Sequence, residues 1–359
     1  MSKNWIFLMI LAASFFSPNA FAQDAPKPVE GDYVAKNFTF KDGEKLAELK
    51  LHYMTLGKPV KDANGRVTNA VLIMHGTGGS GRQFLAKYFA GELFGPGQLL
   101  DANKYYIILR DGIGHGKSSK PSDGMHMKFP KYDYDDMVAA DHLLLTEALG
   151  VNHLRLVMGT SMGCMHSFVW AETYPEFMDA AMPMACLPVQ IAGRNRLWRA
   201  MAMHAITSDP EWKGGEYTEQ PKIAMQTWLD FLLIAGSAPI QMQKELPTRD
   251  AVDKFLEEAY ATRTKNLDAN DILYQVAASR NYDPSSQLGK IKVPVMWINS
   301  TDDFINPPEL GIAEQKVKEI AKGKFVLIPA SDHTYGHGTH THAEVWKGFL
   351  AELLAQSGQ

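Results

Sequence analysis

Continuous apolar runs that end in glycine-containing turns recur along the chain. Three of them occupy residues 70–74, 105–109 and 154–158. Further apolar runs follow near 180–185 and at 293–299 and 324–329. A run that is apolar on both faces is typical of a strand buried in a parallel sheet. Residues 38–57 instead alternate apolar and polar positions around Lys-Asp-Gly, which predicts antiparallel strands joined by a turn.

Helical spacing of apolar residues lies between these strands. It covers 137–148, begins again at about residue 162, and returns in the C-terminal segment 342–356. Strands that alternate with helices predict an α/β fold, with a mostly parallel central sheet flanked by helices.

One long region breaks this alternation. Residues 187–272 contain helical and irregular patterns but no comparable apolar strand. We interpret this region as a helical cap inserted between strands. The core of the fold would then consist of residues 23–186 and 273–359.

The N-terminus has the pattern of a secretory signal. Lys3 is the only charged side chain before Asp24, and residues 5–16 form an apolar block too short to span a bilayer comfortably. Small residues at Ala20 and Ala22 predict cleavage after Ala22, so residues 1–22 are expected to be removed. The mature chain would be periplasmic or secreted, with no stable membrane insertion. An uncleaved N-terminal anchor is the alternative.

Composition narrows the possible partners. The chain has 36 basic and 40 acidic residues and no polybasic run, so no nucleic-acid partner is expected. Its two cysteines are Cys164 and Cys186. An exported protein could pair them, but two cysteines do not form a disulfide framework. We expect two buried, reduced thiols, and a bridge is the alternative.

The strongest chemical signal follows the strand expected at 154–158. Residues 159–163 read Gly-Thr-Ser-Met-Gly, a match to the G-x-S-x-G pattern, with a helix expected immediately afterwards. This strand–turn–helix context distinguishes a nucleophilic serine on a tight turn from an ordinary loop serine. Ser161 would also lie at the N-terminus of that helix, where backbone N–H groups favour developing negative charge.

A serine nucleophile needs a base, and the base needs an acid that orients it. In sheets of this kind the chain order is serine, acid, histidine. Asp302 and Asp303 follow the strand expected at 293–299, where sites gather in open parallel sheets. We favour Asp303 over Asp302, because Asp303 precedes Pro307 by four residues. This arrangement is usual after the corresponding strand in hydrolases that have the chain order serine, acid, histidine.

Four histidines follow the last expected strand, and one of them could be the base. We favour His337 over His333 and His340, because the preceding Gly336 gives the backbone freedom to aim the ring. With His342, these histidines could instead form a metal site. No cysteine or carboxylate spacing supports that alternative, so neither a metal nor an organic cofactor is expected.

Two backbone N–H groups should form the oxyanion hole. One belongs to Met162, the residue after the nucleophile, and the other to Thr77 in the loop after the first buried strand, with Gly76 as second choice. That loop reads GTGGSG and could be a dinucleotide loop, but Asp111 does not fit the required acidic position. A phosphate loop at GIGHGKSS fails because Asp111 replaces an essential glycine.

These motifs together resemble the homoserine O-acetyltransferase-like branch of the α/β-hydrolases, over most of the mature chain. The resemblance implies that Ser161, Asp303 and His337 form a catalytic triad and that Thr77 and Met162 supply the oxyanion donors. The stretches that carry it are GKPVKDANGRVTNAVLIMHG, GPGQLLDANKYYII, GTSMGCMHSFVWAETYPE, AITSDPEWKGGEY, LDANDILY and YGHG.

Departures from the transferases concern the acyl acceptor. Thr160 and Cys164 replace two elbow glycines, and Gly338 stands where the transferases have an aspartate after the histidine. Leu229 occupies the place of a cap arginine that binds the substrate carboxylate. A site without that acid and that arginine has little to orient a zwitterion. Export would also separate the enzyme from cytosolic acetyl-CoA.

The sequence therefore predicts an exported serine hydrolase that cleaves a small-molecule carboxylic ester through an acyl-enzyme. The alternatives are an O-acyltransferase of the homoserine O-acetyltransferase type and a binding module without activity. By analogy with related transferases, a homodimer through the cap is expected.

Overall fold

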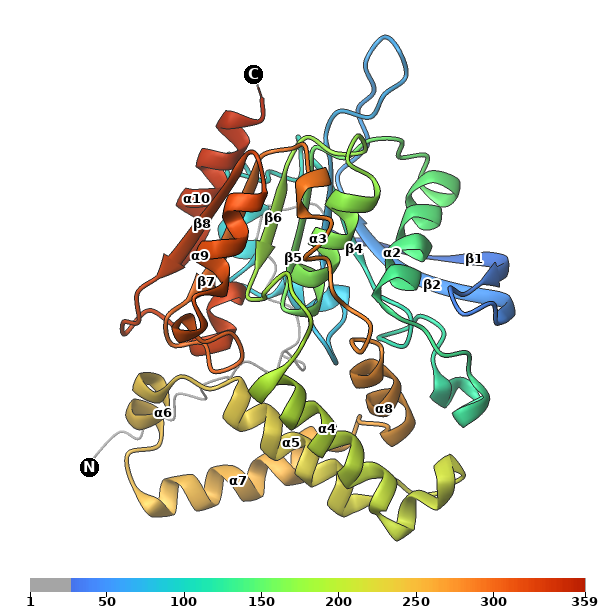
Figure 1. Ribbon diagram of the computed structural model, residues 1–359, viewed down its shortest axis with the longest axis vertical. Coiled ribbons are helices and arrows are strands. Elements are labelled where there is room, and N and C mark those ends of the chain that lie inside the picture. Colours follow the sequence, from blue (N-terminus) through green and yellow to red (C-terminus); the bar gives the residue numbers. More distant parts are fainter. Residues whose placement is uncertain (1–26, 359) are drawn as a thin grey trace.

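The computed structural model describes residues 27–358, so the expected signal peptide and its cleavage site at Ala22 lie outside the described residues. Within this range one sheet has the strand order β1-β2-β4-β3-β5-β6-β7-β8 (Figure 1). The strands are β1 Val29–Thr39, β2 Lys45–Leu56, β3 Ala70–Met74, β4 Tyr106–Arg110, β5 Leu156–Thr160, β6 Ala181–Met184, β7 Val295–Ser300 and β8 Gly323–Ile328.

Strand direction agrees with the apolar patterning. β1 pairs antiparallel with β2, and β2 with β4, while every other pairing is parallel. The alternating segment 38–57 thus covers β2 and only the last two residues of β1, whose earlier part was not predicted. The apolar runs form the parallel centre, where β3, β4 and β5 are buried at every position. The α/β fold with a mostly parallel sheet is confirmed, and each predicted parallel strand lies within two residues of an observed one.

Helices cover both faces of the sheet. Residues of α2 and α3 belong to one apolar cluster, and residues of α1 and α10 belong to the cluster on the other face. α2 continues as a π-helical turn over Leu144–Ala148. The helices are α1 Ala90–Leu93, α2 Tyr134–Leu143, α3 Met162–Thr173, α4 Gly193–Ser208, α5 Lys222–Ala235, α6 Pro239–Glu245, α7 Arg249–Arg263, α8 Ala269–Ala277, α9 Ile312–Lys316 and α10 Ala343–Gln356.

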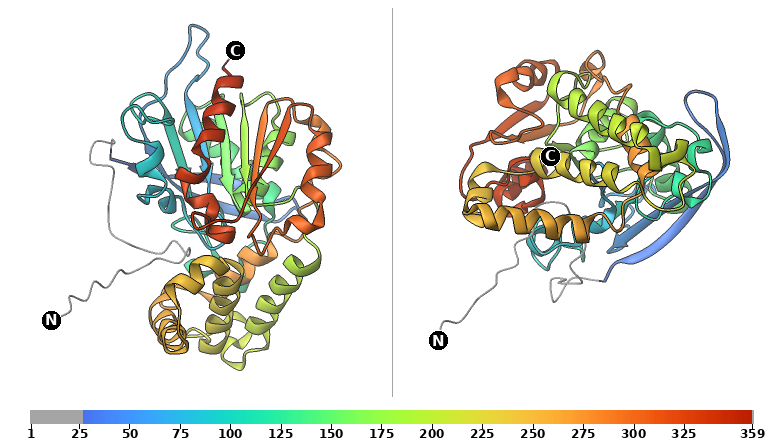
Figure 2. Two further views of the ribbon diagram at one scale, coloured as in Figure 1. Left: turned by 90° about the vertical axis from the view of Figure 1, so that its left-hand side faces the viewer. Right: turned by 90° about the horizontal axis from the view of Figure 1, so that it is seen from below.

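Five helices, α4 to α8, separate β6 from β7 and lie below the carboxyl ends of the strands in Figure 1. The left-hand view in Figure 2 shows them as a layer next to the sheet. They have their own apolar cluster around Trp198 and Trp228. The predicted cap boundary at residue 272 falls inside α8, because that helix contributes Ile272 to this cluster and Tyr274 to the sheet's cluster.

The expectation of two reduced thiols is wrong, because Cys164 and Cys186 form a disulfide with their Cα atoms 5.8 Å apart. Cys164 lies in the first turn of α3, and Cys186 lies just beyond the end of neighbouring β6. A separation of 22 residues does not reveal this proximity, because it arises only when β5, α3 and β6 pack together.

Within residues 27–358 no single helix is both long and apolar enough to cross a bilayer. Only α5 and α6 taken together reach that length, and they meet at 110°.

Candidate active site

Ser161 lies on the sharp turn between β5 and α3. Its backbone has φ 55° and ψ −109°, which side-chain-bearing residues rarely adopt. The two glycines of the motif permit this turn through close packing. A Cβ on Gly159 would lie 2.1 Å from the carbonyl oxygen of Gly163, and a Cβ on Gly163 would lie 2.0 Å from that of Met74 in β3. The pattern is therefore a steric requirement of the elbow.

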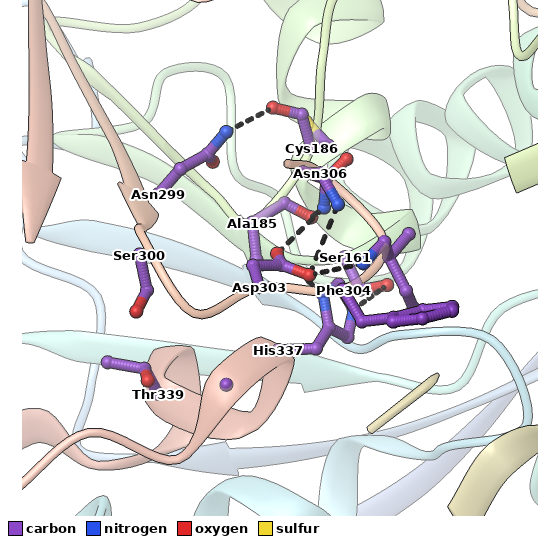
Figure 3. Close-up of polar contacts among 12 residues, drawn as sticks. Ser161, Ala185, Cys186, Asn299, Ser300, Asp303, Phe304, Asn306, His337 and Thr339 are labelled. Atoms are coloured by element: carbon purple, nitrogen blue, oxygen red, sulfur yellow. Dashed lines mark hydrogen bonds and ion pairs between the residues drawn. The ribbon is translucent and has the colours of Figure 1, made fainter. Parts of the chain in front are cut away.

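Three of the residues selected from the sequence form one hydrogen-bonded chain (Figure 3). The Ser161 hydroxyl lies 2.8 Å from His337 Nε2, and His337 Nδ1 lies 2.9 Å from Asp303 Oδ2. Ser161 follows β5, Asp303 follows β7, and His337 lies in the short 3-10 helix Gly336–Thr341 after β8. The carboxyl ends of separate strands thus bring the side chains together. The catalytic roles of these residues remain predictions.

Asp303 is buried but well supplied with donors. Its Oδ1 accepts hydrogen bonds from the backbone N–H of Ile305 at 2.8 Å and of Asn306 at 3.2 Å, and its Oδ2 accepts one from Asn306 Nδ2 at 2.9 Å. Burial acts to raise the pKa of Asp303, but the His337 charge and these hydrogen bonds outweigh it and lower the pKa. Asp303 is therefore an ionised acceptor that fixes the proton on His337 Nδ1.

Asp302, the alternative acid, faces the histidine loop instead of the His337 ring. Its Oδ2 accepts hydrogen bonds from the Thr334 hydroxyl at 2.8 Å and from the Gly336 N–H at 3.1 Å. It therefore holds the segment that carries His337, a positioning role that the sequence reasoning did not assign.

The other histidines of the loop do not converge on Ser161. The His333 side chain is 78% exposed and lies beside Asp332. The His340 ring packs edge-on against His337, with centroids 5.2 Å apart. Burial, and then the charge of His337, lowers the pKa of His340 far below its usual range, so its ring is neutral. Among residues 27–358, no group of three histidine, cysteine or acidic side chains could hold a metal ion.

The two candidate oxyanion donors flank the nucleophile. Met162 is the first residue of α3, where backbone N–H groups lack intrahelical partners. Thr77 follows Gly76, and a Cβ on Gly76 would lie only 3.2 Å from the Cβ of Ser161. This loop therefore packs directly against the nucleophile, and Thr77 and Met162 stay the predicted oxyanion residues.

His75 fixes the orientation of this loop. Its Nε2 accepts a hydrogen bond from the Gly112 N–H at 3.0 Å, so Nδ1 carries the proton and donates to the Gly76 carbonyl at 2.8 Å. Burial, and then the Arg110 charge, lowers the pKa of His75 far below its usual range and keeps the ring neutral. Because a trans peptide points its C=O and N–H in opposite directions, fixing the Gly76 carbonyl also directs the Thr77 N–H.

The buried ion pair between Arg110 and Asp141 holds the His75 ring in place. Arg110 Nε donates to Asp141 at 2.9 Å, and its other nitrogens reach His75 Nε2 at 3.1 Å and His166 Nδ1 at 2.7 Å. Both Arg110 and Asp141 are almost fully buried. This network connects β4, α2 and α3 to the loop that carries Thr77. The sequence offered one signal for it, a histidine placed between a buried strand and a glycine-rich turn.

Comparisons with known proteins agree with this architecture. The family model for the alpha/beta hydrolase fold matches residues 69–335. A homoserine O-acetyltransferase from Citrifermentans bemidjiense is 30% identical over 83% of this chain and 89% of its own. The homoserine O-acetyltransferase structure from Bacillus anthracis has a TM-score of 0.78 at 21% identity, covering 91% of this chain and 97% of its own. An acetylester hydrolase structure from Corynebacterium glutamicum has a TM-score of 0.77 at 20% identity, covering 91% and 96%. The chain belongs to the α/β-hydrolase superfamily, within its homoserine O-acetyltransferase-like branch.

Proposed function

We propose that this enzyme is an exported serine hydrolase that cleaves small carboxylic esters through an acyl-enzyme. The observation that carries the proposal is the hydrogen-bonded chain from Ser161 through His337 to Asp303, with the serine on a strained elbow. No other hydroxyl described in the structure has both a histidine partner and a carboxylate behind that histidine.

In the proposed reaction, each step of hydrolysis uses a group of this hydrogen-bonded chain or of the oxyanion loop. The Ser161 hydroxyl attacks the ester carbonyl while His337 Nε2 takes its proton, and Asp303 stabilises the imidazolium that results. The N–H groups of Thr77 and Met162 hold the oxyanion. His337 then gives the proton to the leaving alcohol. In the second half, water attacks the acyl carbonyl while His337 Nε2 takes a proton from it. The bond from the acyl carbon to Ser161 Oγ then breaks, the acid leaves, and His337 returns the proton to Ser161 Oγ.

Water is favoured over an amino-acid acceptor because two transferase features have no counterpart at the corresponding positions. Leu229 is buried in an apolar cluster with Leu233 and Ala259, so it packs within the helical layer. Gly338, directly after His337, has no side chain to hold an ammonium group. Transfer to a small acceptor is the second candidate, and the names of the similar homoserine O-acetyltransferases favour it.

Export forms part of the same proposal. The Cys164–Cys186 disulfide supports it, because such bonds persist in oxidising compartments and are rare in the cytosol. N-terminal sequencing of the protein from a periplasmic or culture-supernatant fraction should begin at Gln23. A chain that stays with the cells and begins at Met1 would contradict this part of the proposal.

Turnover of 4-nitrophenyl acetate and butyrate tests the reaction. The wild type should release nitrophenol, Ser161→Ala and His337→Ala should lose activity by orders of magnitude, and His333→Ala should keep it, because His333 is a surface residue. If the wild type does not exceed Ser161→Ala, the esterase proposal fails. Release of CoA from acetyl-CoA that depends on added homoserine would instead establish the transferase.

A homodimer through the helical layer is also proposed. Four large apolar side chains are exposed on α4 and α5, which agrees with a covered surface there. They are Leu197, Met201, Ile223 and Ile234. Light scattering after size exclusion should give twice the mass of the mature chain, and Ile223→Glu with Ile234→Glu should give the monomer mass. A wild type that elutes as a monomer at micromolar concentration would contradict the dimer.

A further inference from the structure

Arg199 on α4 is a buried guanidinium without an acidic partner. Its Nε donates to Asn195 Oδ1 at 2.9 Å and its Nη1 to the Ser279 hydroxyl at 3.2 Å. Only 2% of the residue is exposed, and no carboxylate of residues 27–358 forms a salt bridge with it. Buried arginines are ordinarily paired, as Arg110 is with Asp141. Arg199 therefore has capacity for an anion that the described chain does not use.

A second guanidinium lies beside the first. Arg196 precedes Arg199 by three residues on the same helical face, and its charge, after burial, contributes to lowering the pKa of Arg199. Arg196 Nη1 is buried and has no hydrogen-bond partner among the described residues. A buried guanidinium beside a second, partly buried one, without a counter-charge, is costly. An anion that bridges them would remove that cost.

Both arginines lie over the proposed active site. α4 crosses it from the acid loop, where the Arg194 guanidinium lies 3.9 Å from the ring centroid of Phe304, the residue after Asp303. Further along α4, Arg199 lies near the hydroxyl of Tyr134, which also has Thr77 as a neighbour.

Buried polar atoms without partners lie both on the arginines and in the proposed oxyanion loop. The buried hydroxyls of Tyr134 and Thr77 have no partner at full hydrogen-bond distance and angle within residues 27–358, although Thr77, Ser279 and Arg199 lie close enough to the Tyr134 hydroxyl to act on its pKa. Such groups are rare in folded proteins, and they point to a ligand that would satisfy them. We call Arg196, Arg199, Tyr134 and Ser279 the Arg199 cluster.

We propose that the Arg199 cluster binds a carboxylate carried by the ester substrate, so that the enzyme acts on acidic esters. This inference rests on the proposed esterase function. A guanidinium binds a carboxylate through two parallel N–H···O hydrogen bonds, which would orient the substrate as well as hold it. The arginine comes from α4, whereas the transferase arginine aligns with Leu229 on α5, so this chain would recognise its substrate from a different helix.

Matched ester pairs test the inference. On the acyl side, 4-nitrophenyl hemisuccinate is compared with 4-nitrophenyl butyrate, and on the alcohol side, O-acetyl-lactate with isopropyl acetate. The wild type should prefer the acidic member of at least one pair, and the pair that shows the preference identifies the side of the ester that carries the carboxylate. In Arg199→Gln the kcat/KM for that acidic ester should fall roughly tenfold to a hundredfold, as expected for lost hydrogen bonds to a charged group. Turnover of its neutral partner should change far less.

Controls separate the cluster from general electrostatics and from misfolding. Arg249→Gln removes one positive charge from the exposed start of α7 and should leave the preference intact. Arg199→Lys keeps the charge and should retain part of the preference, and Arg196→Gln should reduce it independently. Succinate should inhibit hydrolysis of the neutral ester competitively, and more weakly in Arg199→Gln.

Two results would overturn the inference while leaving the esterase intact. One is a wild type that hydrolyses neutral esters and shows no preference for either acidic ester, a result that needs no variant to fold. The other is an acidic preference that Arg199→Gln and Arg196→Gln both retain. Failure to hydrolyse any ester above Ser161→Ala would instead overturn the proposed function.

Discussion

Replacement of Asn306 by leucine tests whether the acid loop positions the catalytic carboxylate. The Asn306 side chain donates two hydrogen bonds through Nδ2, one to Asp303 Oδ2 and one to the Ala185 carbonyl, each at 2.9 Å. The same Asp303 oxygen accepts from His337 Nδ1 (Figure 3). Asn306 therefore ties the carboxylate plane to the end of β6. Leucine removes both hydrogen bonds while keeping the same number and branching of side-chain heavy atoms.

The magnitude follows from what Asp303 retains. Its Oδ1 keeps the backbone N–H groups of Ile305 and Asn306, so the carboxylate stays ionised, but Oδ2 keeps only His337. A hydrogen bond to a charged group contributes about 1.5–3 kcal/mol. If that amount is lost mainly in the transition state, kcat falls by roughly tenfold to a hundredfold, while KM changes little.

Asn299→Leu is the matched control. Asn299 is also buried, and its Nδ2 donates to the neighbouring Cys186 carbonyl at 3.1 Å, but it does not contact Asp303. Both variants remove a buried hydrogen bond to a backbone carbonyl, and Asn306→Leu should lose more stability in urea unfolding because it also loses the bond to Asp303. Only Asn306→Leu should lose kcat with a nitrophenyl ester. Equal kcat in the two variants would refute the positioning role, because the loss of stability would then account for every effect.

Three further predictions concern stability. Because the folded pKa of Asp303 is lowered, its carboxylate stabilises the fold above its unfolded pKa of roughly 3.9, and this contribution disappears as pH falls through the folded pKa. The stability difference between wild type and Asp303→Asn should thus shrink as pH falls below about pH 4. Replacing Cys164 and Cys186 by alanine should cost about 3 kcal/mol in urea unfolding, for a closed loop of 22 residues, and a reductant should destabilise the wild type but not this variant. Gly163→Ala should unfold at lower temperature or lose activity, because its Cβ would lie 2.0 Å from the last carbonyl oxygen of β3. Gly348→Ala in α10, where a Cβ has open space, should be neutral or stabilising. Equal melting temperatures for the two glycine variants would contradict the packing argument.

The fold could be predicted because a strand that is buried on both faces of the sheet consists of consecutive apolar residues. β3, β4 and β5 consist of residues that are all buried, and each appears in the sequence as an uninterrupted apolar run or nearly so. The side chains of the proposed catalytic triad could be predicted for a related reason. Parallel strands bring their carboxyl ends to one edge, so Ser161, Asp303 and His337 could be selected without knowledge of their contacts.

The supporting contacts could not be predicted, because they join segments far apart in the chain through groups that every residue type carries. His75 acts through the Gly76 carbonyl, and Asp302 acts through the Gly336 N–H. The Arg199 cluster is likewise assembled from α4, the end of α8 and the start of α2. Two of the supporting residues left a local trace. His75 lies between a buried strand and a glycine-rich turn, and Asn306 belongs to a turn pattern in which an aspartate accepts from N–H groups two and three residues later.

Residues 184–186, which have no proposed catalytic role, connect the turn that bears Ser161, the loop that bears Asp303 and helix α3. The Met184 carbonyl accepts the Ser161 N–H at 2.9 Å, the Ala185 carbonyl accepts Asn306, and Cys186 bonds to α3 through its sulfur. Ala185 has φ 65°, a conformation that side-chain-bearing residues rarely adopt. The nucleophile elbow, the acid loop and the disulfide thus share one short anchor at the end of β6. That anchor lies between the turn that bears Ser161 and the loop that bears Asp303. The same three residues therefore resist a shift of either one, which helps to hold both at hydrogen-bond distance from His337.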